Sequence, residues 1–136
     1  MVREIVWLFT WGGATFAIPP QAADAQTGSP LMLVQTDGDN YYIARANALE
    51  NNVSLYHTTN GRRNTIKYVN APVAKNRWHT LKVDFSGNTV RVVFDGKLYI
   101  EQKDNHISGA GTVGVWTKAD SITAFDDFSY TSATDR

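Results

Sequence analysis

Apolar and polar residues alternate along most of the chain from residue 31 onward. Such period-two alternation is typical of β-strands with one buried and one solvated face. No stretch of useful length shows the 3.6-residue period of an amphipathic helix. The alternation and the apolar runs predict strands at 31–36, 41–49, 53–59, 62–69, 77–85, 89–94, 97–102, 112–116 and 122–130.

Turn residues separate these strands at intervals typical of antiparallel sandwiches. Asn60-Gly61 and Asp95-Gly96 are strong two-residue hairpin signals, and Ser86-Gly87-Asn88 marks another reversal. The sequence therefore predicts an all-β protein, an antiparallel jelly-roll sandwich.

The first 25 residues differ from the rest. Arg3 precedes an apolar run over 5–18, and Ala23-Asp24-Ala25 forms an A-x-A pattern. This layout predicts a secretory signal peptide over 1–25, with the sandwich domain at 26–136. An uncleaved membrane anchor or a structural strand is the alternative for 1–25. We therefore expect an exported protein that is periplasmic, extracellular or tethered to a membrane.

Charge and composition exclude some functions. Thirteen basic residues balance thirteen acidic ones, which gives no electrostatic reason to expect a nucleic-acid partner. The chain has no cysteine, so disulfides, thiolate metal sites and cysteine nucleophiles are excluded.

Three stretches carry a family resemblance: "DNYYIARANALENNVSLY" (39–56), "RWHTLKVDFSGNTVRVVFDGKLYIEQKD" (77–104) and "GAGTVGVWTKADSITAFDDFSY" (109–130). Together they resemble the concanavalin A-like lectin/glucanase superfamily. More narrowly, they resemble the bacterial laminin-G-like domains related to the 3-keto-disaccharide hydrolase family. The resemblance implies a bacterial β-sandwich, but this fold hosts lectins, hydrolases and inert modules alike.

The chain departs from this family in its N-terminal part. Members carry further strands before the one that matches 31–36. Either residues 1–30 supply substitute strands, or these N-terminal strands are missing and one sheet has an open edge. An open edge favours a homo-oligomer or docking on another protein.

Asp126 and Asp127 are adjacent, between Phe125 and Phe128. A regular strand cannot bury both rings on one face, so a β-bulge is expected here. The re-aimed carboxylate either bonds to backbone N–H groups or helps to bind a structural Ca²⁺. The expected cofactor is therefore none or Ca²⁺, with Asp126 and Asp127 as the metal candidates.

The three histidines, His57, His79 and His106, share no metal-ligand spacing. His79 alternates with core positions and is predicted to be a hydrogen-bonded structural residue.

The candidate ligand-binding residues are polar and aromatic side chains opposite the core face. In a curved sandwich they line the concave sheet, where aromatic rings stack on sugars and polar groups bond to hydroxyls. Alternatively, the aromatic residues pack under loops and the arginine pairs with a surface acid. The candidates are Arg45, Asn47, Tyr56, Trp116 and Lys118.

We therefore expect a non-catalytic module that binds a carbohydrate or another protein outside the cell. The resemblance leaves a glycosidase-like enzyme acting on a sugar derivative as the first alternative. The E-x-D-x-x-E-like strand motif that the superfamily's glucanases carry does not occur in the sequence. The second alternative is an accessory subunit of a cell-envelope or membrane assembly.

Overall fold

The structure is a computed structural model, and it describes residues 20–21, 30–75, 77–107, 112–117 and 124–125. Within these residues all regular secondary structure is β-strand. The strands are β1 (Pro20–Gln21), β2 (Pro30–Asp37), β3 (Asn40–Asn47), β4 (Asn52–Thr59), β5 (Arg62–Asn70), β6 (Leu81–Ser86), β7 (Thr89–Phe94), β8 (Lys97–Lys103), β9 (Thr112–Thr117) and β10 (Ala124–Phe125).

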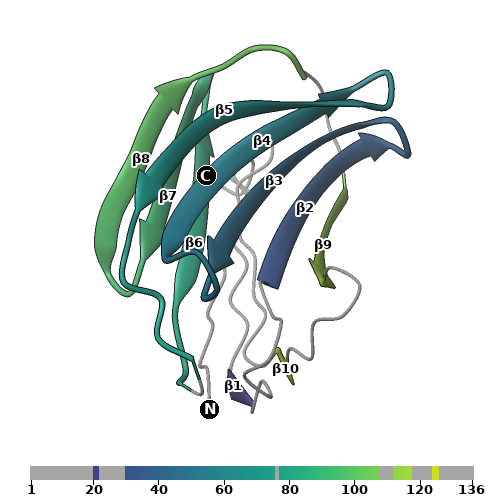
Figure 1. The fold of residues 1–136 in the computed structure, drawn as a ribbon. Coiled ribbons are helices and arrows are strands. Elements are labelled where there is room, and N and C mark those ends of the chain that lie inside the picture. Colours follow the sequence, from purple (N-terminus) through teal and green to yellow (C-terminus); the bar gives the residue numbers. More distant parts are fainter. Residues whose placement is uncertain (1–19, 22–29, 76, 108–111, 118–123, 126–136) are drawn as a thin grey trace, which may run out of the picture.

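The strands form two main antiparallel sheets (Figure 1). The larger sheet has the order β5-β4-β3-β2-β9, and the smaller has the order β6-β7-β8. The short strands β1 and β10 pair with each other. This arrangement confirms the predicted all-β sandwich.

The apolar core lies between the two main sheets. Every second residue of β3, β4, β6 and β7 points into it, as the alternation predicts. The largest fully buried side chains are Phe94, Leu55, Leu81, Ile100, Val53 and Val83.

Two hairpins form at the turn dipeptides that the sequence singled out. Asn60 and Gly61 have φ of 51° and 71°, and Asp95 and Gly96 have φ of 48° and 79°. Positive φ at both central residues is the geometry of a type I′ turn, whose twist matches that of the flanking strands. These turns join β4 to β5 and β7 to β8.

One predicted strand begins four residues too early. The alternation at 77–85 predicts a strand from residue 77, but β6 begins at Leu81. Just before it, the Thr80 backbone bonds to Asp95: Thr80 N donates to the carboxylate at 2.8 Å, and Thr80 O accepts from Asp95 N at 2.7 Å. These two bonds hold Thr80 against the turn between β7 and β8. Regular pairing of β6 with β7 therefore begins only at Leu81.

The N-terminal prediction for 1–25 lies outside the described residues, apart from Pro20 and Gln21. No helix of the described residues has the length and apolar character to cross a membrane.

Among the described residues, β5 is an outermost strand of the larger sheet, and Arg62, Arg63 and Lys67 on it are exposed. Charged side chains discourage edge-to-edge pairing, and oligomerisation stays a prediction.

Candidate functional site

The larger sheet has a second face, turned away from the core, which we call the outer face. It carries the residues of β3, β4 and β5 that alternate with the core positions. Cross-strand pairing places Arg45 opposite Ser54, Asn47 opposite Asn52, and Ser54 opposite Tyr68. The outer face therefore carries polar residues and, at Ile43 and Tyr56, a small buried hydrophobic cluster.

Three residues of the outer face and Glu50 of the turn between β3 and β4 form a hydrogen-bonded group that we call the polar end cluster: Asn47, Glu50, Asn52 and Tyr68. The Glu50 carboxylate accepts bonds from Asn47 Nδ2 at 2.9 Å and from Asn52 Nδ2 at 3.1 Å. Asn52 Nδ2 also donates to the Tyr68 hydroxyl at 2.8 Å. The buried amides of Asn47 and Asn52 thus hold an exposed carboxylate in one position.

The local sequence explains why Glu50 lies there. Asn47 ends β3, and its Oδ1 accepts a bond from Leu49 N at 3.0 Å, an Asx turn that reverses the chain. Asn51 then adopts a positive φ of 51°, which asparagine tolerates better than most residues. The short turn between β3 and β4 therefore fixes the backbone of Glu50.

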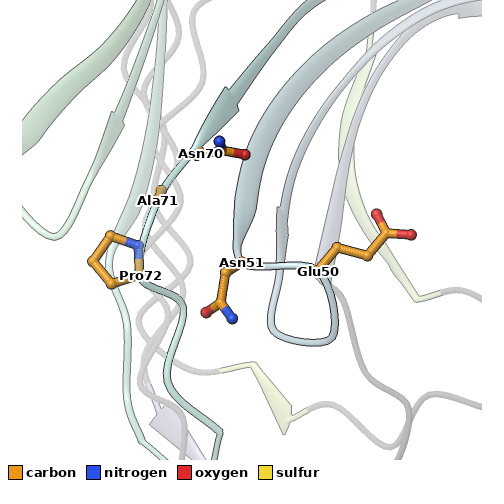
Figure 2. Close-up of a pocket in the computed structure, with 5 residues that line it drawn as sticks. All are labelled: Glu50, Asn51, Asn70, Ala71 and Pro72. Carbon is orange, nitrogen blue, oxygen red and sulfur yellow. The ribbon is translucent and has the colours of Figure 1, made fainter.

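A cavity of about 550 Å³ lies beside this turn and is open to solvent. Asn51 secures its wall, because Asn51 O accepts from Ala71 N at 3.0 Å and Asn51 Oδ1 accepts from Val73 N at 3.1 Å. Figure 2 shows the lining residues, which come from the β3–β4 turn and from the end of β5: Glu50, Asn51, Asn70, Ala71 and Pro72.

Tyr68 gives the polar end cluster an aromatic surface. Its side chain is 49% exposed, while its hydroxyl is held by Asn52. A half-exposed ring with a fixed orientation, next to a fixed carboxylate, is a geometry suited to a ligand with both apolar and hydroxylated faces.

Tyr56 lies further along the outer face and is only 7% exposed. The Arg63 guanidinium sits 3.9 Å from the centre of its ring. Burial acts to raise the pKa of Tyr56, but polar contacts from Ser54, Arg45 and Arg63, together with the Arg63 charge, outweigh it and lower the pKa. The ring of Tyr56 therefore packs against Arg63 of β5 and Ile43 of β3.

The structure brings three of the five predicted ligand-binding residues onto one face: Arg45, Asn47 and Tyr56. Asn47 is 1% exposed, and its side chain bonds to Glu50. Trp116 lies on β9 in register with Leu31 of β2, which is itself the cross-strand partner of Arg45. Lys118 and the calcium candidates Asp126 and Asp127 lie outside the described residues.

The sequence interpretation missed Glu50, Tyr68 and Asn70. A β-bulge opposite Leu55 and Tyr56 shifts the register of β5. The sequence carries one signal of this bulge, because Ile66 and Val69 are both apolar although they are three residues apart. In the structure both side chains pack against the core. Recognising it places Tyr68 on the outer face.

The two main antiparallel sheets define a β-sandwich. The chain belongs to the galactocerebrosidase C-terminal lectin domain family, whose model matches residues 32–133.

The fold is also similar to a solved structure, the carbohydrate-binding module CBM66 from Bacillus subtilis. The two share 19% sequence identity with a TM-score of 0.69, over 88% of this chain and 83% of that one. No curated protein matches the sequence significantly. The narrower relation to laminin-G-like domains and 3-keto-disaccharide hydrolases stays a prediction.

Proposed function

We propose that this protein binds a carbohydrate without cleaving it, and that the polar end cluster with Asn70 is the binding site. One observation carries the proposal: the half-exposed ring of Tyr68 lies next to the Glu50 carboxylate, which two buried amides hold in place. A sugar ring offers an apolar C–H face for stacking and hydroxyls that donate to a carboxylate. The lectin family and the fold of a carbohydrate-binding module support the same role.

The number of carboxylates at the cavity favours binding over catalysis. Glycoside hydrolysis normally requires two carboxyl groups across the scissile bond. Glu50 is the one carboxylate among the described residues that line the cavity, and its other neighbours there are amides and apolar groups. Glu50 is therefore assigned to hydroxyl recognition.

The same proposal places the protein outside the cytoplasm. Its support is the N-terminal sequence, where a basic residue, an apolar run and the A-x-A pattern at 23–25 follow one another.

Glycan-array screening of the full chain tests the binding role. Because the family is named after galactocerebrosidase, the array includes galactose-terminated oligosaccharides. We expect binding to a defined glycan and no release of reducing sugar from it. Release of a reducing sugar would contradict the proposal and favour the enzymatic alternative.

Two substitutions locate the site by calorimetry with the bound glycan. Tyr68→Ala removes the stacking surface and Glu50→Gln removes the charged acceptor, so each is expected to raise Kd about tenfold or more. Leu98→Ala is the matched control, since Leu98 is similarly exposed, at 48%, but lies on β8 of the other sheet. Unchanged affinity in both site variants would place the binding site elsewhere.

A further inference from the structure

A second group of side chains gathers at the far end of β4, where the chain leaves β8. His57 and His106 stack with ring centroids 4.0 Å apart and an interplanar angle of 13°. Asp104 lies beside them, and each of the three residues offers one donor atom within 4.8 Å of the other two. Two imidazoles and a carboxylate thus lie close together, one from β4 and two from the segment that follows β8.

Hydrogen bonds already position Asp104 and His106. The Tyr42 hydroxyl and His106 N both donate to Asp104 Oδ1, the latter at 3.0 Å. Asp104 Oδ2 lies 2.8 Å from His106 Nδ1. Tyr42 is also the cross-strand partner of His57, and its hydroxyl accepts a bond from Ile107 N at 3.2 Å. The segment carrying His106 is therefore tied to β3 and β4.

The hydrogen bonds leave one nitrogen of each imidazole available. His57 Nδ1 lies 2.9 Å from Thr59 Oγ1, and His106 Nδ1 is occupied by Asp104. Among the described residues, no hydrogen bond engages the Nε2 atom of either ring. Metal-binding histidines commonly have one nitrogen held by a hydroxyl, carbonyl or carboxylate while the other binds the ion.

We propose that His57, Asp104 and His106 form a binding site for a divalent transition-metal ion, with Zn²⁺ as the ion of choice. Imidazole nitrogens with a carboxylate oxygen are a common ligand set for Zn²⁺. Tetrahedral Zn–N bonds of about 2.0–2.1 Å place ligand atoms about 3.4 Å apart. In the stacked arrangement the two imidazole planes are nearly parallel, and an ion must lie in the plane of each ring that binds it, so binding requires His106, which is 55% exposed, to rotate out of the stack toward His57 and Asp104. Solvent supplies the fourth ligand.

The electrostatics suit a metal ion. Burial and the neighbouring His106 lower the pKa of His57, which favours the neutral imidazole that a metal requires. Burial acts to raise the pKa of Asp104, but hydrogen bonds from Tyr42 and His106 outweigh it and keep the carboxylate charged. Protons compete with the ion for the imidazole nitrogens, so Zn²⁺ affinity is expected to decline as the pH falls.

The test is Zn²⁺ titration of the full chain, purified without a histidine tag. Calorimetry is expected to give one ion per chain. Long-range ¹H–¹⁵N spectra of the imidazoles are expected to show shifts for His57 and His106 but not for His79. His79 is the internal control, because both its ring nitrogens bond within the protein.

Variants assign the ligands. His106→Ala and Asp104→Asn are expected to raise the Kd for Zn²⁺ by about 10- to 100-fold. Asn105→Ala, an exposed neighbour in the same segment, is the matched control and keeps wild-type affinity. Because His106 is exposed, its replacement leaves the core intact. Unshifted His57 and His106 resonances at millimolar Zn²⁺, or wild-type affinity in His106→Ala, would overturn the proposal.

Discussion

Replacing Phe94 by alanine is expected to lower the free energy of unfolding by about 3–5 kcal/mol, because it opens a cavity in the centre of the core. Among the residues that the structure describes, Phe94 is the largest fully buried side chain, and it ends β7. Its ring packs on His79, with centroids 4.8 Å apart, and edge-on against Tyr99 at 6.2 Å. Three segments of the chain therefore lose contacts together.

Urea denaturation followed by circular dichroism measures this loss. Val93→Ala is the control, since Val93 lies on the same strand but is only partly buried. We expect the control to lose about 1 kcal/mol or less. Equal losses in the two variants would contradict the assignment of Phe94 to the core.

The second large effect is expected at His79, where alanine should reduce the free energy of unfolding by about 2–3 kcal/mol. His79 is 4% exposed, with Nδ1 2.6 Å from Asp95 Oδ2 and Nε2 2.7 Å from Ala74 O. Both ring nitrogens therefore have a hydrogen-bond partner within the protein, which alanine removes. These bonds confirm the structural role predicted from the sequence.

Asp95→Asn shows how much of the stabilisation by His79 depends on the carboxylate of Asp95. The amide oxygen still accepts from Thr80 N, which the carboxylate does at 2.8 Å, but the carboxylate oxygen that faces His79 Nδ1 is replaced by an NH₂ group. Since Asp95 is 45% exposed, we expect a smaller loss, about 1 kcal/mol. A larger loss for Asp95→Asn than for His79→Ala, measured by the same denaturation, would contradict this order.

Much of the fold follows from local rules that act within a few residues. Period-two alternation identifies the inward residues of β3, β4 and β7, and asparagine or aspartate followed by glycine identifies the turns at 60–61 and 95–96. The start of β6 could not be predicted from local rules, because Thr80 bonds to the side chain of Asp95, which is distant in sequence. Strand ends depend on such tertiary contacts.

The sites were harder to predict, because each joins residues from separate strands. Glu50 is an isolated acid in the sequence, and its role depends on amides from β3 and β4 and on the bulge in β5 that turns Tyr68 to the outer face. Likewise, no spacing rule connects His57 with His106. They meet only because the end of β8 returns to the side of β4.

The central claim is that a carbohydrate binds at the polar end cluster, and one measurement tests it most directly. The ¹⁵N-labelled chain is titrated with the glycan that binds best on the array, and backbone amide shifts are mapped. The account predicts shifts concentrated at Glu50, Asn51, Tyr68 and Asn70, with β6 to β8 unaffected. Saturable shifts confined to other strands, with these four amides unmoved, would contradict it.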